Sequence, residues 1–197
     1  GRESLASWDA QLAAHGVELM ADRRAAVAAL AQPFSRLAVE LGLDGDASVR
    51  YRPRSAATDA ADLAAELADR IDGDLERGYT AHGPHRDELV TSRAGRELRA
   101  YGSQGQQRLA LLALLLAERE VLASTRSAPP LMLLDDVMSE LDTDRRRALV
   151  ELLRSTDGQS VITTTDLEHV PGSGDPSIAR LAVSTGEVHE EALVRDA

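Results

Sequence analysis

The sequence predicts an α/β protein in which a parallel sheet is covered by helices and a helical arm is attached. From residue 79 onward, short apolar segments alternate with amphipathic ones, the pattern of strands that pair in parallel through helical crossovers. The clearest strand is the apolar run Leu131–Leu134, which reads as buried. Before residue 79, apolar residues recur mostly at three- or four-residue intervals, as in helices. We therefore expect a helical arm at residues 1–78. Residues 79–197 are expected to form part of the domain that contains the parallel sheet, which we call the head.

The expected arm is two helices joined by a strand, and nothing in it demands catalysis. Residues 2–41 form the first helix, which Gly16 and Pro33 are expected to bend or divide, since proline removes a helical hydrogen bond. The other elements are the strand Ser48–Arg52 and a helix capped by Thr58 or Asp59 that runs to about residue 77 with Leu63, Leu67, Ile71 and Leu75 on one face.

The expected head alternates strands and helices after an initial β-hairpin. Ser103 is a candidate N-cap, and Gln106 completes a capping box in which each side chain accepts from the other residue's backbone N–H. The expected elements are a hairpin at 88–92 and 97–101, a helix from Ser103 to about 124, a strand at 131–134, a helix at 143–154, a strand at 160–164 and a hairpin at 178–183 and 186–192.

Composition and charge restrict the function classes. The chain has no cysteine, which leaves no disulfide framework and no thiolate metal site. Its longest apolar run is far too short to span a bilayer, so we expect a cytoplasmic protein without a membrane partner. The net charge of -11 argues against a surface that attracts nucleic acid as a whole. Two local arginine stripes are either solvated surface or nucleic-acid contacts: Arg93, Arg96 and Arg99, and Arg50, Arg52 and Arg54.

One motif of phosphate chemistry is missing. Phosphate-cradling loops of the form GxxxxGK[ST] use a lysine that reaches the terminal phosphates. All 22 basic residues of this chain are arginine. We therefore expect that the chain does not hydrolyse ATP by itself.

Two carboxylates follow the apolar strand. A strand that ends at Asp135 places this group where α/β folds bind ligands, beyond the carboxyl ends of the strands. There Asp135 would hold Mg²⁺ against nucleotide phosphates, and Asp136 could orient or deprotonate the attacking water. The alternative is a pair of capping or turn aspartates.

The start of the helix at Ser103 is a candidate anion site. Exposed amides and the positive end of the helix dipole favour an anion there. Gly105 would let the backbone approach a phosphate closely, and the Ser103 hydroxyl could donate to a phosphate oxygen when it is not capping. A capped helix start that contains glycine is common, so this motif gains weight only from the strand and aspartates that follow it.

Taken together, the motifs resemble the RecF family of bacterial DNA replication and repair proteins. The resemblance covers nearly the whole chain and places it in the carboxyl-terminal half of that family. Each piece alone is shared with ATPases of the ABC and SMC types. The segments that carry the resemblance are Ser103-Gln104-Gly105-Gln106-Gln107-Arg108, Leu133-Leu134-Asp135-Asp136-Val137-Met138-Ser139-Glu140-Leu141-Asp142, Gly83-Pro84-His85-Arg86-Asp87 and Ile162-Thr163-Thr164-Thr165.

This resemblance implies the carboxyl-terminal half of an ABC-type ATPase head that binds ATP and Mg²⁺ and dimerises with ATP on gapped or junction DNA. It also implies work with RecO and RecR to load RecA in recombination repair and the SOS response. In this family pattern Asp135 is the magnesium ligand, Asp136 the catalytic carboxylate, and Ser139 to Asp142 the D-loop that joins the two sites. The signature residues Ser103, Gln104, Gly105 and Gln106 act in trans, on the γ-phosphate held by the opposite subunit.

Two departures from the wider ABC pattern bear on hydrolysis. Asp136 stands where transporters usually place glutamate, which puts the rate in doubt. Thr163-Thr164-Thr165 stand where transporters place a switch histidine, and His169 is a loop residue rather than a substitute. His85 and Arg86 belong either to a structural turn with an Arg86–Asp87 ion pair or to a DNA or nucleotide contact.

Three functions stay open from the sequence. The first is an ATPase switch whose slow hydrolysis dissociates a DNA-bound dimer. The second is a non-catalytic module that docks DNA or protein partners. The third is the half-head of another SMC-type or ABC-type ATPase, although residues 2–41 are too short and interrupted for a long coiled coil.

Overall fold

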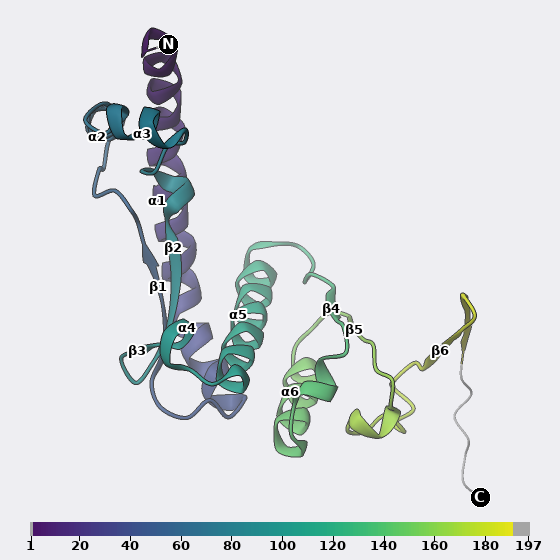
Figure 1. The fold of residues 1–197 in the computed structure, drawn as a ribbon. Helices are drawn as coiled ribbons and strands as arrows, with labels where there is room; N and C mark the ends of the chain where they lie inside the picture. Colours follow the sequence, from purple (N-terminus) through teal and green to yellow (C-terminus); the bar gives the residue numbers. More distant parts are fainter. Residues whose placement is uncertain (1, 191–197) are drawn as a thin grey trace, which may run out of the picture. The chain divides into compact units, whose positions relative to one another are not determined.

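The computed structural model describes residues 2–190, without the side chains of residues 2–4 and 6. The chain forms two compact units, Gly1–Thr125 and Arg126–Ala197, and Figure 1 shows the order of their elements along the sequence. The first unit contains a three-stranded sheet and the second contains two two-stranded sheets, and each unit has its own buried residues. We describe the units one at a time.

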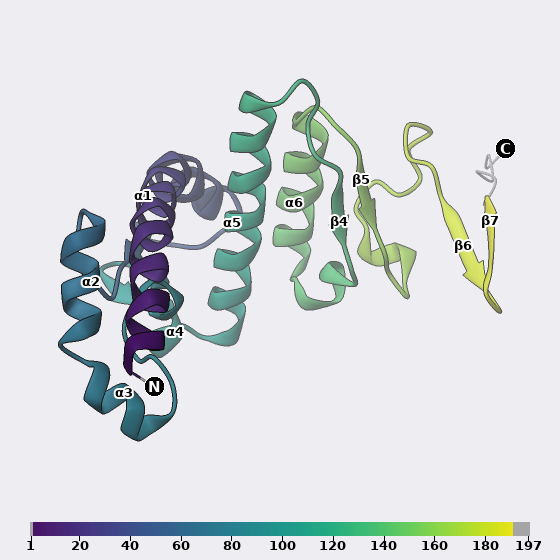
Figure 2. The same ribbon diagram turned by 90° about the horizontal axis from the view of Figure 1, so that it is seen from above.

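A single long helix organises the first unit. This helix, α1 (Arg2–Glu40), packs against α2 (Ala60–Ala68), β1 (Ala47–Arg52) and α5 (Gln104–Thr125), as Figures 1 and 2 show. The expected division of the helix is wrong, because Pro33 lies inside it as a buried residue and the helix continues to Glu40. Gly16 has a packing role instead: a Cβ there would lie 3.0 Å from side-chain atoms of both Leu63 and Pro84.

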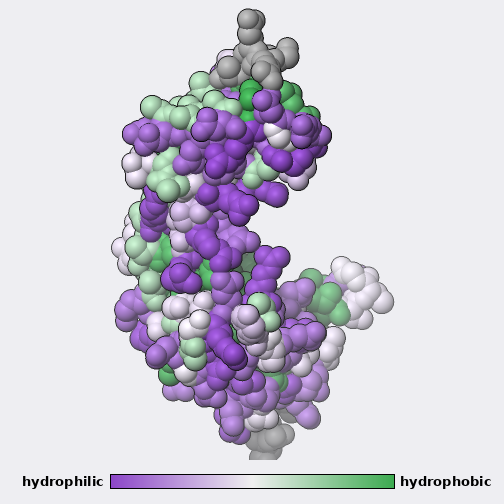
Figure 3. Space-filling view, turned by 60° about the vertical axis from the view of Figure 1, so that its left-hand side comes forward, coloured by the Kyte–Doolittle hydropathy of each residue, from purple (hydrophilic) through white to green (hydrophobic). Residues whose placement is uncertain are grey.

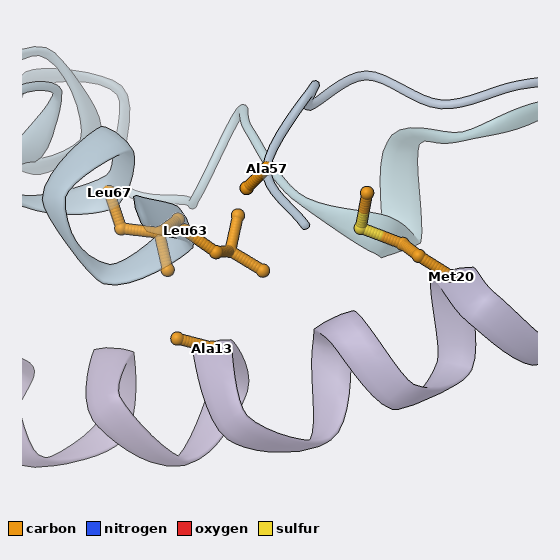
Figure 4. Packing of buried hydrophobic residues seen from close by; sticks show 5 residues of the cluster. All are labelled: Ala13, Met20, Ala57, Leu63 and Leu67. Carbon is orange, nitrogen blue, oxygen red and sulfur yellow. The ribbon is translucent and has the colours of Figure 1, made fainter. Parts of the chain in front are cut away.

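The packing of α2 on α1 forms a small apolar core. Figure 4 shows Leu63 and Leu67 of α2 facing Ala13 on α1, with Ala57 of the preceding loop beside them. All four of these side chains are buried. Since alanine presents only a methyl group, α2 can approach α1 closely, and the leucines fill the space between the helices.

The second arm helix is shorter than expected. Its N-cap is Asp59, whose side chain accepts from the Asp62 backbone N–H at 2.9 Å. The helix ends at Ala68, and a separate helix α3 (Ile71–Arg77) follows and stops at Gly78, which has φ 77°. The expected apolar face does not continue into α3, because Leu75 is 47% exposed there.

An antiparallel sheet joins the two sides of the division expected at residue 78. Its strand order is β1, β2 (Glu88–Arg93) and β3 (Arg96–Glu97). The β2–β3 turn places Ala94 and Gly95 at positive φ, as in tight hairpin turns. The second hairpin strand is shorter than expected, because Leu98 begins a helical turn, α4 (Leu98–Tyr101), that buries its side chain. The boundary between arm and head at residue 78 stays a prediction.

The second unit contains the expected parallel strands and helix. Strand β4 (Met132–Leu134) pairs in parallel with β5 (Ser160–Ile162), and α6 (Thr143–Ser155) lies between them in sequence. Strand β4 is buried on one side only, because Leu133 is 67% exposed. The core of this unit consists of Met132, Leu134, Met138, Leu141, Leu149, Val150 and Leu153.

A terminal hairpin follows, formed by β6 (Leu181–Ser184) and β7 (Glu187–Glu190). The end of the expected hairpin, residues 191 and 192, lies outside the described residues. Short 3-10 turns complete the fold: Pro84–Arg86, Val137–Glu140 and Leu167–His169.

The described surface is mostly polar. Figure 3 shows hydrophilic residues over most of one face, with apolar residues scattered among them. Among the described residues, none of the helices is sufficiently long and apolar to cross a bilayer.

Candidate functional site

The two predicted aspartates lie at the carboxyl edge of the parallel strand pair. Strand β4 ends at Leu134, and Asp135 and Asp136 follow as exposed residues. Directly after the neighbouring strand β5, the Thr163 backbone N–H donates to the Leu134 carbonyl at 2.9 Å. The backbone pairing of the two segments therefore continues one residue beyond β5. The structure therefore brings Asp135, Asp136 and Thr163 to one edge, where α/β folds bind ligands.

The Thr163 hydroxyl contacts both aspartates. It donates to Asp135 Oδ1 at 2.5 Å and accepts from the Asp136 backbone N–H at 3.0 Å. Thr163 was not among the predicted site residues, and the sequence pointed to it only as part of the Ile162–Thr165 segment. The available signal was its place directly after the strand that pairs with β4, because parallel strands end at the same edge of a sheet.

Asp136 has an unusual backbone conformation. Its φ of 46° lies in the left-handed region, which aspartate and asparagine tolerate better than most residues. The Ser139 hydroxyl lies 2.9 Å from both the carbonyl oxygen and Oδ2 of Asp136, so it can donate to either. The predicted catalytic carboxylate and the predicted D-loop serine are therefore neighbours, and Ser139 helps to fix where the Asp136 side chain lies.

Asp142 has a structural role in this chain. It is the N-cap of α6, and its Oδ1 accepts from the Arg145 backbone N–H at 3.0 Å. The other carboxylate oxygen lies 3.1 Å from the Arg145 guanidinium. These contacts account for an aspartate at this position without a nucleotide, and the predicted part of Asp142 in a composite site stays a prediction.

The donor chemistry at Asp135 suits Mg²⁺. Magnesium is usually held by one or two carboxylates together with phosphate oxygens and water, not by a cage of protein ligands. Among the described residues, no group of three or more histidine, aspartate or glutamate side chains could hold a metal ion by itself. Asp135 is thus compatible with a magnesium ion shared with a nucleotide, and this role stays a prediction.

The predicted capping box is present at the start of α5. The Gln106 backbone N–H donates to Ser103 Oγ at 3.3 Å, and the Ser103 backbone N–H donates to Gln106 Oε1 at 3.0 Å. Gln107 strengthens this start, because its side-chain amide donates to the Gly102 carbonyl at 3.0 Å. Ser103 therefore caps the helix in this chain, and its predicted contact with a phosphate stays a prediction.

Gly105 has no steric reason to be glycine within the described chain. It lies in the first turn of α5 and is exposed, as is Gln104 beside it. Apart from its chain neighbours and the backbone of its own helix, a Cβ at Gly105 would meet none of the described atoms within 4 Å. Packing within the described chain therefore does not explain why this position is glycine.

The site residues divide between the two units. Ser103, Gln104, Gly105 and Gln106 belong to the first unit, while Asp135, Asp136, Ser139 and Asp142 belong to the second. Within the second unit, Asp135, Asp136 and Ser139 form one hydrogen-bonded group through Thr163 and Asp136. The expected action of the signature residues on the nucleotide of an opposite subunit stays a prediction.

The Gly83–Asp87 segment forms a structural turn whose ion pair differs from the expected one. The Asp87 side chain is 1% exposed and pairs at 3.2 Å with Arg23 of α1, not with Arg86. It also accepts from the Tyr51 hydroxyl and, at 2.7 Å, from the Arg54 backbone N–H. Burial of the Tyr51 ring and its hydrogen bond to this carboxylate raise the tyrosine pKa. Asp87 therefore ties α1 to the sheet.

The two neighbouring residues of this motif remain at the surface. Arg86 is exposed, with its guanidinium carbon 5.9 Å from the centre of the Tyr79 ring. His85 Nε2 lies 2.7 Å from the Thr80 carbonyl oxygen. These contacts fit a turn. Both residues are exposed, so a contact with DNA or nucleotide stays open.

In one arginine stripe, Arg52 is neutralised by neighbouring carboxylates. Arg52 pairs with Glu88 and, at 2.6 Å, with Glu97. The hydrogen bond from Arg52, followed by its charge, lowers the pKa of Glu88. Because two carboxylates face this guanidinium, Arg52 is a poor phosphate ligand, and the interpretation as charged surface applies to it.

RecF proteins are similar to this chain in both sequence and structure. The chain is 40% identical over 185 residues to the DNA replication and repair protein RecF of Herpetosiphon aurantiacus, which covers 93% of this chain and 48% of that protein. The structure of the recombination mediator protein RecF-ATPrS in the RecFOR pathway matches with a TM-score of 0.79 at 28% identity, covering 98% of this chain and 52% of that one. The resemblance to RecF is thereby confirmed, and the chain spans about half the length of the curated relatives it matches.

A more distant match supports the fold alone. A structure from work on ATP-driven dimerization and DNA stimulated activation of SMC ATPases matches with a TM-score of 0.50 at 18% identity, covering 85% of this chain and 86% of that one. The α/β fold of RecF and SMC heads is therefore the fold of this chain. The family model described as "AAA domain, putative AbiEii toxin, Type IV TA system" matches residues 14–167 of the chain. Because this match covers more than half of the chain, the chain belongs to this AAA domain family.

Proposed function

We propose that the chain supplies the signature helix and the magnesium-binding strand end of a RecF-like ATPase. In the complete protein, Asp135 holds Mg²⁺ beside the nucleotide phosphates, and Asp136 orients the attacking water. The start of α5 contacts the γ-phosphate of the nucleotide bound by the opposite subunit. ATP thus links two copies, and hydrolysis releases them.

The observation that carries this proposal is the hydrogen-bonded group at the end of β4. Asp135 and Asp136 lie next to each other, yet each carboxylate has its own hydroxyl donor, Thr163 for Asp135 and Ser139 for Asp136. Separate donors keep the two groups in defined and different positions, as separate roles in metal binding and water activation require. Aspartates that only capped a helix would direct their oxygens at backbone N–H groups of the next turn, as Asp142 does.

Gly105 supports the second half of the proposal. Its Cβ position is open in this chain, so packing does not explain the glycine. A ligand that approaches the backbone closely from outside would account for it, because exposed N–H groups at a helix start bind phosphate. The ligand that fits is the nucleotide of a second copy.

The wider role that we propose is that of RecF in recombination repair. The complete protein would dimerise with ATP on gapped or junction DNA and work with RecO- and RecR-type mediators in the cytoplasm to load a recombinase, as part of the SOS response. Support comes from the likeness to RecF over nearly the whole chain. Since the net charge is -11 and Arg52 is neutralised, DNA contacts would be confined to a local cationic surface.

The test uses this chain mixed with a RecF amino-terminal half that bears the phosphate-cradling loop and its lysine. We expect the mixture, but neither half alone, to hydrolyse ATP and to form a larger ATP-dependent assembly by light scattering. A mixture that associates and binds DNA with the same affinity with and without ATP would favour the non-catalytic docking module instead.

A further inference from the structure

We infer that Thr163 is a positioning residue that sets the two aspartates for metal binding and water activation, an inference that rests on the proposed function. The Thr163 hydroxyl both donates and accepts a hydrogen bond within the site. It donates to Asp135 Oδ1 at 2.5 Å and accepts from the Asp136 backbone N–H at 3.0 Å. One side-chain oxygen therefore fixes the carboxylate of one aspartate and the backbone of the next.

The position of the hydroxyl is itself fixed by the sheet. The Thr163 backbone N–H donates to the Leu134 carbonyl at 2.9 Å, directly beyond the paired residues Leu134 and Ile162. Threonine is also stiff at χ1, because two heavy atoms on Cβ restrict its rotamers. The pairing of β4 with β5 thus fixes the position of Thr163, and Thr163 in turn fixes Asp135 and Asp136, which follow the end of β4.

This support matters most for Asp136. Its backbone is left-handed, with φ 46°, a conformation that costs energy for any residue other than glycine. The hydrogen bond from its N–H to Thr163 stabilises that conformation from one side, and the Ser139 hydroxyl contacts its carbonyl oxygen at 2.9 Å from the other. Without Thr163, we expect this residue to relax and the carboxylate to move away from its working position.

The hydroxyl, rather than the shape of the side chain, is the group that does this. Thr163→Val keeps the branched shape and removes the hydroxyl, whereas Thr163→Ser keeps the hydroxyl and removes a methyl group. Thr165→Val is the matched control, because Thr165 is exposed and lies two residues further along the same segment. All three variants alter exposed positions, so we expect each to fold, which circular dichroism checks.

The first measurement is amide hydrogen exchange in this chain, which requires no nucleotide. Loss of one hydrogen bond should speed exchange at Asp136 by about three- to tenfold in Thr163→Val. Thr163→Ser and Thr165→Val should match the parent chain. An unchanged Asp136 amide in Thr163→Val would overturn the inference.

The second measurement is Mn²⁺ affinity of the complete ATP-bound protein by electron paramagnetic resonance, since Mn²⁺ takes the same oxygen ligands as Mg²⁺. Residues that orient a metal ligand typically contribute about 10- to 100-fold to metal affinity, so Thr163→Val should weaken Mn²⁺ binding by that factor and Thr163→Ser should restore it to within about twofold. Parental affinity in Thr163→Val would overturn the inference while leaving the proposed function intact. If Asp135→Asn also bound Mn²⁺ as the parent does, the proposed function would fail, whatever the exchange result.

Discussion

At the residue scale, the two aspartates after β4 differ in their surroundings although they are adjacent in sequence. Asp135 is held by a hydroxyl of the neighbouring strand, whereas Asp136 is held by the serine three residues later. Asp136 also turns the chain through a left-handed conformation. Such a turn separates the two side chains, which would otherwise compete for the same ion and repel each other.

This difference predicts the effect of Asp136→Asn in the complete protein. The amide keeps the size of the side chain and an oxygen for Ser139, but it removes the charge that orients water. We expect nucleotide binding to persist and turnover to fall by about a hundredfold or more, the usual cost of losing a catalytic base, so that an ATP-bound dimer accumulates.

Steady-state ATPase assays and light scattering measure these two effects. Asp144→Asn is the control, because the Asp144 side chain is 95% exposed on α6. Turnover of Asp136→Asn within about threefold of the parent would identify Asp136 as a turn residue only.

Ser103 offers a second test at this scale, because capping and phosphate binding make different demands on it. Ser103→Arg places a bulky side chain in the composite site, so monomer ATP binding should persist while ATP-dependent dimerisation is lost. Ser103→Asp caps a helix well but repels phosphate, so it should also abolish dimerisation without lowering the melting temperature.

Capping alone predicts the opposite pattern. Loss of an N-cap costs about 0.5 to 2 kcal/mol, so Ser103→Arg would mainly lower the melting temperature. A Ser103→Asp protein that still dimerised normally with ATP by light scattering would leave capping as the only role of Ser103.

At the element scale, the sequence predicted a helix start from its capping residues and a strand pair from its alternating pattern, and it missed details that packing decides. The capping box at Ser103 and the parallel pairing of β4 with β5 are confirmed. The long second arm helix was wrong, because a four-residue repeat does not reveal where an apolar face loses its partner, as it does at the exposed Leu75. Thr163 was missed because the pairing of β4 with β5 does not by itself reveal which side chains beyond the strand ends contact each other, and the partners of Thr163 lie 27 and 28 residues away in sequence.

Gly16 shows how packing reverses a sequence rule and leads to a prediction. Glycine usually weakens a helix, but here the absence of a side chain lets α1 contact Leu63 and Pro84. Gly16→Val would force atoms into a position 3.0 Å from both, and Leu63 is fully buried. Overpacking of this kind costs about 1–3 kcal/mol, which urea unfolding of the chain would detect.

The matched control is Ala14→Val, at an exposed position of the same helix. It introduces the same β-branched side chain, which reduces helix propensity but meets no buried neighbour, so it should cost less than about 1 kcal/mol. Equal destabilisation by the two variants would show that α1 does not pack closely at Gly16.

At the scale of the whole molecule, the described units contain the chemistry of the strand end and the helix start but not that of a phosphate cradle. Asp135 supplies one carboxylate for a metal ion, and among the described residues no larger cluster of metal-binding side chains exists. The binding energy of ATP in such heads comes mainly from backbone amides and a lysine around the β- and γ-phosphates. This chain has no lysine, since its 22 basic residues are all arginine.

We therefore predict that this chain alone neither binds ATP tightly nor hydrolyses it. A single carboxylate cannot hold magnesium-ATP against water, because the metal is bound chiefly through the phosphates that the missing loop would fix. Titration with magnesium-ATP by calorimetry should give no heat beyond dilution, and Asp135→Asn should leave that result unchanged. Micromolar affinity in the unmodified chain, lost in Asp135→Asn, would show instead that the strand end binds the nucleotide without the cradle.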